Sequence, residues 1–92
     1  MDRGKVYGAI DTERYYQDRK WGTVSERPHE VGAWITIMRT LLNDAEKAWS
    51  TNSSDYTALM ELRKVIAVGV ACAEQHGLPE RSLTIAVSER KR

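Results

Sequence analysis

The chain has 92 residues, of which 41% are hydrophobic, with one cysteine and a formal net charge of +1. This length leaves room for a single domain, 1–92, and the lone thiol of Cys72 excludes a disulfide within the chain. Because acidic and basic residues are mixed along the chain, the composition argues against nucleic acid as a partner.

The hydropathy pattern argues against a membrane protein. The longest apolar run, 65–73, is far shorter than the roughly 20 residues that a membrane-spanning helix needs. The first residues are polar, so we expect no signal peptide, and a lone thiol fits a reducing compartment. The sequence therefore predicts a soluble, cytoplasmic protein with no membrane partner.

The first predicted helix spans 11–20 and is followed by a loop at 22–27. Asp11 or Thr12 is a suitable N-cap, and Glu13 places an acid in the first turn. The stripe that this helix turns inward is half polar, because it includes Arg14 and Gln17. We expect these two side chains to face polar groups in a helical bundle.

A longer helix is predicted at 29–50, directly after Pro28, because proline is tolerated in a first helical turn. Apolar residues recur in it at spacings of three and four, which is the pattern of an amphipathic helix. They are Val31, Trp34, Ile35, Met38, Leu41, Leu42, Ala45, Ala48 and Trp49.

Polar turn residues at 50–54 separate this helix from a third one, predicted at 55–76. Ser54 is the expected N-cap, and Gly77, followed by Pro79, is the expected end. The short connection makes the two long helices antiparallel neighbours.

Part of the third helix, 65–73, is apolar on all sides. This predicts burial against more than one neighbour, and we expect a second copy of the chain to supply part of the cover. Farther on, 83–87 is apolar enough for a strand or a docked helix, of which we expect the helix. The predicted fold is all-α, an antiparallel two-helix hairpin plus a shorter N-terminal helix. Its core lies at about 11–77 with a tail at 78–92, and it assembles as an oligomeric bundle.

The hairpin register predicts which residues lie side by side. Both helices rise equally per residue, so residues whose numbers sum to about 105 are neighbours. This places Asp44 beside Glu61, Leu41 beside Lys64, and His29 beside His76.

Asp44 and Glu61 are candidates for two kinds of site. Two facing carboxylates are suitable ligands for Mg²⁺. The preferred interpretation is a structural salt-bridge cluster, because a half-buried carboxylate needs a cation. The cations expected nearby are Arg14, Arg39, Arg63 and Lys64.

A second candidate metal site lies at the open end of the predicted hairpin. His29, Cys72 and His76 gather there, and their side chains have the right chemistry for zinc. Their spacing matches no zinc motif. In the alternative interpretation, His76 interacts with the C-terminal end of its own helix, where a cation is favourable.

The segment 13–22 carries the pattern E-R-x-x-Q-x-x-K-W-G, and His29 and the pair Trp34-Ile35 follow it. In this layout, from 13 to 77, the chain resembles the MazG-like all-α nucleotide pyrophosphohydrolases, most closely their small phage and bacterial members. The resemblance implies a helical dimer or tetramer. It also implies magnesium-dependent cleavage of nucleoside triphosphates by an E-x-x-E and an E-x-x-D motif on successive helices.

This chain departs from those two motifs. The first falls on 41–44, where only Asp44 is acidic, and the second on 61–64, where Glu61 is kept and Lys64 is a cation. Two carboxylates beside an ammonium hold a divalent ion poorly, and hydrolysis needs that ion to orient the phosphates and activate water. We therefore expect no cofactor and no catalytic residue, and Mg²⁺ belongs to the enzyme alternative.

The predicted function is a non-catalytic MazG-like oligomer whose charged cluster binds an anionic or nucleotide-like ligand. The candidate ligand-site residues are Arg14, Gln17, Lys20, Arg39, Asp44, Glu61, Arg63 and Lys64. One alternative is a divergent magnesium-dependent pyrophosphohydrolase that uses Asp44 and Glu61 and recruits acids from a neighbouring chain. The acids considered for this role are Glu30, Glu46 and Glu74. Another alternative is an adaptor that binds proteins through its basic end, 89–92, or through an apolar groove.

Overall fold

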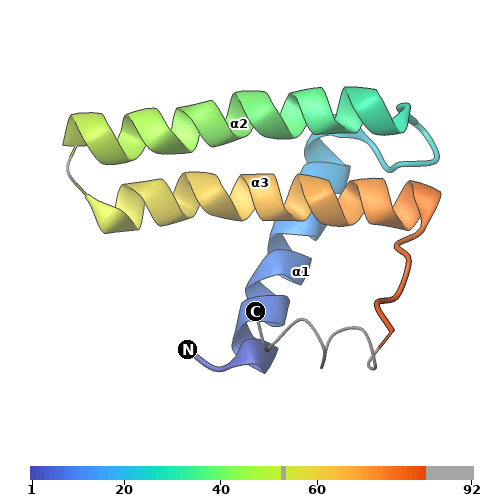
Figure 1. The fold of residues 1–92 in the computed structure, drawn as a ribbon, viewed down its shortest axis with the longest axis horizontal. Coiled ribbons are helices and arrows are strands. Elements are labelled where there is room, and N and C mark those ends of the chain that lie inside the picture. The colour runs from blue at the N-terminus through green and yellow to red at the C-terminus, as the bar shows by residue number, and fades with distance from the viewer. Residues whose placement is uncertain (53, 83–92) are drawn as a thin grey trace.

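Three α-helices make up most of the part of the chain that the computed structural model describes, residues 1–52 and 54–82 (Figure 1). Helix α1 covers Arg3–Trp21, α2 covers Val31–Asn52 and α3 covers Asp55–His76. No strand occurs in these described residues, so the predicted all-α class is confirmed. The segment 83–87, for which a short helix was expected, lies outside them.

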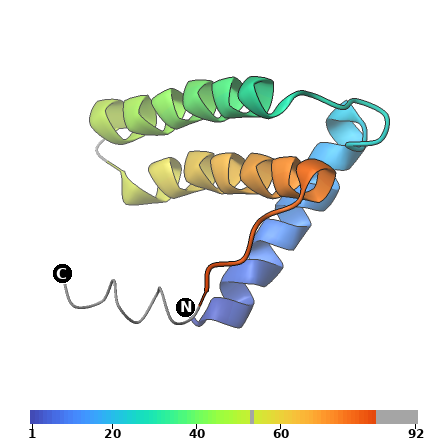
Figure 2. The same ribbon diagram turned by 45° about the vertical axis from the view of Figure 1, so that its right-hand side comes forward.

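The helices form a hairpin with a third helix across it. α2 and α3 run antiparallel and side by side, and α1 crosses α3 at a steep angle (Figures 1 and 2). α1 packs against α3 and not along α2. Within the described residues, no helix has both the length and the apolarity needed to cross a membrane.

Both predicted ends of α3 are confirmed. The Ser54 hydroxyl accepts the backbone N–H of Thr57 at 3.3 Å and so caps the N-terminus of the helix. At the other end, Gly77 adopts φ 87° and donates its N–H to the Ala73 carbonyl at 2.7 Å. This φ, combined with an extended ψ, is a backbone region that only glycine enters readily.

The predicted start of the first helix is wrong. α1 begins at Arg3 and not near residue 11, and its N-cap is Asp2, whose carboxylate accepts the N–H of Lys5 at 2.9 Å. Two glycines, Gly4 and Gly8, lie inside the additional turns. Because glycine has a low helix propensity, the sequence does not predict a helix there. The C-terminal end is close to the prediction, because Gly22 closes the helix with φ 96°.

The apolar core is small and lies between α2 and α3. Trp34, Val68 and Ala71 form its buried centre. The residues packed around them are Val24, Ile37, Met38, Leu41 and Cys72. Trp34 is the only large side chain among the buried hydrophobic residues described, so much of the apolar surface of the helices stays uncovered.

The all-round apolar stretch 65–73 receives its cover largely within one chain. Val65, Ala67, Val68 and Ala71 are buried, and α1 packs against α3. The cover expected from a second copy is thus supplied in part by α1. Ile66, which is 39% exposed, marks the side of α3 that no helix of the described chain covers. Assembly into an oligomer remains a prediction.

Two glycine substitutions should act in opposite directions on stability. Gly77→Ala should lower the free energy of unfolding by about 1–3 kcal/mol, because a Cβ strains the backbone at this φ. Gly8→Ala should raise it by about 0.5–1 kcal/mol, because Gly8 is a helical position at which an added Cβ contacts no other atom. Urea unfolding followed by far-ultraviolet circular dichroism measures both. A Gly77→Ala variant at least as stable as the unmodified chain would contradict the assigned backbone at Gly77.

Candidate functional site

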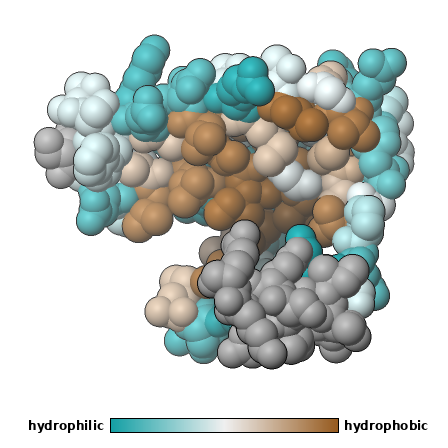
Figure 3. All heavy atoms as spheres, in the orientation of Figure 1, coloured by the Kyte–Doolittle hydropathy of each residue, from teal (hydrophilic) through white to brown (hydrophobic). Residues whose placement is uncertain are grey.

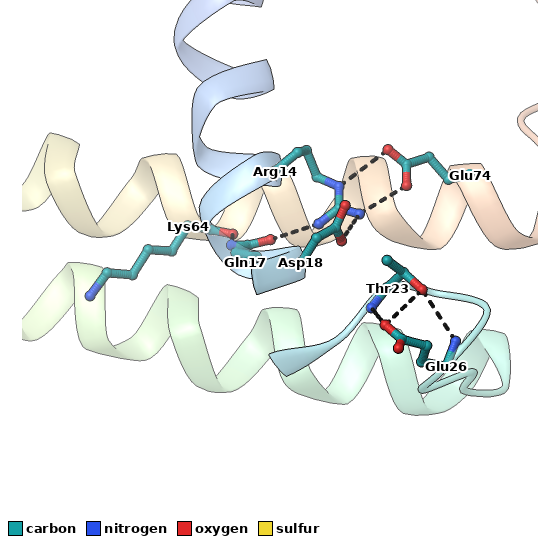
Figure 4. A network of polar contacts seen from close by, with 7 residues as sticks. All are labelled: Arg14, Gln17, Asp18, Thr23, Glu26, Lys64 and Glu74. Carbon is teal, nitrogen blue, oxygen red and sulfur yellow. Dashed lines mark hydrogen bonds and ion pairs between the residues drawn. The ribbon is translucent and has the colours of Figure 1, made fainter. Parts of the chain in front are cut away.

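The guanidinium of Arg14 joins α1 to α3. Its Nε and Nη2 donate to the two oxygens of Glu74 at 3.2 and 2.9 Å, and Nη2 also donates to Asp18 at 2.7 Å (Figure 4). Nη1 donates to the side-chain oxygen of Gln17 at 3.3 Å. The Arg14 side chain is only 6% exposed. Hydrogen bonding to Glu74 raises the pKa of Arg14 above its ordinary value and outweighs the opposing effect of burial, so this residue stays charged.

Two further buried polar side chains of α1 complete this docking. Gln17 donates from Nε2 to the backbone carbonyl of Lys64 at 3.2 Å. Glu13, whose side chain is 7% exposed, accepts from Nε of Arg63 at 2.9 Å. No buried side-chain nitrogen or oxygen in the described residues lacks a hydrogen-bond partner. The inward half-polar stripe predicted for this helix therefore does face polar groups, of which Glu74, Arg63 and the Lys64 carbonyl belong to α3.

The side chains of the remaining residues of the predicted charged cluster do not join this network. Lys64 donates from Nζ to both oxygens of Glu61 at 3.1 Å, one turn away on the same helix. Lys20 lies over the Trp21 ring, with 5.2 Å between Nζ and the ring centroid. Arg39 and Asp44 are exposed on α2, and neither forms a hydrogen bond or ion pair with the described residues.

The structure does not bring His29, Cys72 and His76 together as a zinc site. Nε2 of His76 lies 2.8 Å from the backbone carbonyl of His29, which confirms that these residues are neighbours. The His29 ring, however, packs edge-on against Trp34 with centroids 4.7 Å apart, and Cys72 packs against the core. No group of three or more His, Cys, Asp or Glu side chains within 1–52 and 54–82 is placed to hold an ion.

A side chain that sequence reasoning missed, Gln75, ties the α1–α2 loop to α3. Its Oε1 accepts the backbone N–H of His29 at 3.1 Å and the indole N–H of Trp34 at 2.9 Å. Its Nε2 donates to the His29 carbonyl at 2.8 Å. Sequence reasoning treats a glutamine near a helix end as solvent-exposed, so no local pattern predicts that Gln75 binds the loop.

The loop has its own stabilising turn. The Thr23 N–H and hydroxyl donate to Oε1 of Glu26 at 2.9 and 3.1 Å, and Glu26 donates its N–H back to the Thr23 hydroxyl at 3.3 Å (Figure 4). These bonds to Thr23 lower the pKa of Glu26 below its ordinary 4.5, with a smaller effect from Arg27. Their contribution to loop stability is therefore present above about pH 4.5 and is lost as the pH falls through the lowered pKa.

A pocket of about 290 Å³ opens where the end of α1, the loop and the α2–α3 hairpin meet. Most of its lining is apolar or aromatic, and the rest is polar and charged. The apolar and aromatic residues are Trp21, Val24, Trp34, Ile37, Leu41, Val68 and Ala71, and the polar ones are Arg14, Gln17, Asp18, Arg27 and His29. Gly22 completes the wall.

The charged side chains that line this pocket differ in whether they already have an ion-pair partner. Arg14 is paired with both Asp18 and Glu74, so its charge is already used within the chain. Arg27 is exposed, and its guanidinium has no hydrogen bond or ion pair within the described part of the chain. The pocket therefore combines apolar and aromatic walls with one cation that is available to a ligand.

No protein-family model, no curated protein and no solved structure matches this chain. The resemblance to the MazG-like enzymes rests on the residues quoted for it. Three of those residues, Glu13, Arg14 and Gln17, are the buried polar residues that dock α1 on α3.

Removing the Arg14 guanidinium should loosen α1. Arg14→Leu should lower the free energy of unfolding by about 2 kcal/mol, because Gln17 and two partly exposed carboxylates lose their charged partner. Amide exchange in α1 should rise more than in α2. Arg19→Leu is the matched control, since Arg19 is exposed on the same helix and, among the described residues, bonds only to Tyr15. An equal loss of stability in both variants would contradict the role given to Arg14.

Proposed function

We propose that the protein is a non-catalytic helical binding protein whose pocket takes a small ligand with an aromatic ring and an anionic group, such as a nucleotide-like molecule. The observation that carries this proposal is the pocket between α1, the loop and the hairpin. This pocket combines apolar walls with the guanidinium of Arg27, which is available to a ligand. The proposed ligand is still anionic, as the sequence predicts. Its proposed binding site is this pocket and not the charged cluster, whose residues are dispersed in the structure.

The walls favour a flat, mostly apolar group. Trp21 and Trp34 line the pocket, and the His29 and Trp34 rings already pack against each other in a T-shaped arrangement. Aromatic side chains stack on or meet the edges of ligand rings at little cost in conformational entropy. A volume of about 290 Å³ lies at the lower end of ligand pockets, which suits one ring system better than an extended molecule.

The rim favours a negative charge, and Arg27 is the residue that provides this preference. Arg14 donates most of its hydrogen bonds to Glu74, Asp18 and Gln17 and is committed to holding α1. A carboxylate or phosphate that reaches Arg27 gains a charge-assisted hydrogen bond, worth about 1.5–3 kcal/mol.

The carboxylates of the described chain support a binding role over catalysis. Glu13, Glu61 and Glu74 are each engaged by a cation, namely Arg63, Lys64 and Arg14. Lewis-acid chemistry on a triphosphate needs several carboxylates directed at one ion. The proposal includes descent from a MazG-like fold in which two of the four acidic positions are now Leu41 and Lys64.

The charge preference can be measured with matched pairs of ligands. Adenosine monophosphate is compared with adenosine, and indole-3-carboxylate with indole, by calorimetry and tryptophan fluorescence. The anionic member of at least one pair should bind about tenfold more tightly, since one charge-assisted bond is worth at least 1.4 kcal/mol. The two pairs separate a nucleotide from another aromatic anion as the ligand class.

A single substitution should remove this preference. Arg27→Gln should bring the anionic and neutral ligands to within about twofold of each other, because the charge at the rim is lost. Lys47→Gln is the control, since Lys47 is an exposed cation on α2 outside the pocket lining. Equal binding of charged and neutral ligands by the unmodified chain, or no binding of either pair, would sink the proposal. Magnesium-dependent release of pyrophosphate that Glu61→Gln abolishes would favour the enzyme alternative.

A further inference from the structure

One face of the α2–α3 hairpin is apolar, and no helix of the described chain covers it. In the view of Figure 3, hydrophobic side chains spread across both long helices, and α1 passes behind α3 on the other side (Figure 1). Ile35, Leu42 and Trp49 of α2 are 50%, 51% and 57% exposed. On α3, Leu59 is 59% and Ile66 is 39% exposed.

The spacing of these residues is that of a helix-packing seam. Ile35, Leu42 and Trp49 follow one another at intervals of seven residues, and so do Leu59 and Ile66. A seven-residue interval keeps apolar side chains in line along a helix and is typical of the seam between packed helices. The face therefore fits other helices better than a flat or irregular surface.

The pattern on α2 is symmetric about Leu42. Ile35 lies seven residues before it and Trp49 seven residues after it. Beside this stripe, Arg39 lies three residues before Leu42 and Glu46 four residues after it. Both charged side chains are exposed, and neither has an ion-pair partner in the described residues.

Such a pattern is complementary to itself. If two copies of α2 run antiparallel about an axis at Leu42, Ile35 of each copy meets Trp49 of the other. Arg39 of each copy then meets Glu46 of the other. A two-fold axis always produces reciprocal contacts of this kind, in which each residue pair occurs twice. The order of charges along α2 is thus complementary to that of a second copy of the same chain.

We propose that two copies of the chain pack these hairpin faces together, α2 against α2 and α3 against α3, about a two-fold axis that crosses the helices at Leu42. The product is a four-helix bundle with α1 on its outside.

The size of the face is sufficient for such a dimer. A helix of 22 residues is about 33 Å long, and two packed helices are about 20 Å wide, which gives roughly 650 Å² on each copy. Stable interfaces bury about 800 Å² on each partner, so the face is close to the standard size.

Substitution at the axis tests the use of this face. The full chain should be a dimer by sedimentation analysis, and Leu42→Glu should convert it to a monomer that keeps its helical circular dichroism. Thr40→Glu, on the opposite side of α2 and exposed, should stay dimeric. A monomeric unmodified chain at millimolar concentration would overturn the proposal, as would a dimer that Leu42→Glu leaves intact.

Charge exchange tests the pairing and remains informative if Leu42→Glu fails to fold. Arg39→Glu and Glu46→Arg should each weaken the dimer roughly tenfold, because like charges then face each other twice. The double variant, which carries both substitutions, should regain the original affinity. If α2 instead packs against α3 of the second copy, the double variant stays weak and the proposed axis is wrong.

Disulfide trapping tests the position of the axis. Leu42→Cys in a Cys72→Ala background should form a disulfide-linked dimer under mild oxidation, because the axis brings both copies of residue 42 together. Thr40→Cys in the same background is the matched control and should remain unlinked. Equal linking of both variants, or linking of Thr40→Cys alone, would contradict an axis at Leu42.

Discussion

The position of α1 depends on one buried guanidinium. α1 buries no apolar residue, and its buried side chains are Glu13, Arg14 and Gln17. Hydrogen bonds are directional, whereas apolar contacts are not, so a polar docking fixes the orientation of a helix. The two-pronged contact of Arg14 with Glu74 anchors α1 across α3. The crossing of α1 over α3 (Figure 2) places the pocket beside α1 and leaves the opposite face of the hairpin bare (Figure 3).

The long helices could be read from the sequence because their signals are local. Periodic apolar residues located α2 and α3, and Ser54 and Gly77 marked the ends of α3 within one residue. The register of the hairpin also predicted that His29 and His76 are neighbours. The first turns of α1 had no such signal, since Gly4 and Gly8 disfavour a helix and no apolar stripe compensates for them.

The candidate site was less accessible to sequence reasoning, because charged groups choose their partners in three dimensions. A cluster of eight residues was expected in the bundle, three of them on the first helix and five on the hairpin. In the structure Lys64 binds Glu61 one turn away, and Arg63 and Arg14 bind acids of other helices. The pocket is formed by α1, the loop, α2 and α3 together, and its loop wall is held by Gln75. No window along the chain contains these residues together.

The two sides of the hairpin have separate roles in these proposals, and the helical period of α2 keeps them apart. Leu41 lines the pocket, while its neighbour Leu42 lies on the bare face. A ligand in the pocket contacts α1, the loop and the hairpin at once, so binding stabilises the docked position of α1 by mass action. The contacts proposed between two copies involve α2 and α3 on the opposite side. Loss of Arg14 should therefore weaken ligand binding, because α1 is loosened, and should leave dimer affinity nearly unchanged. This result would show that the ligand pocket and the dimer interface are separate surfaces of one fold.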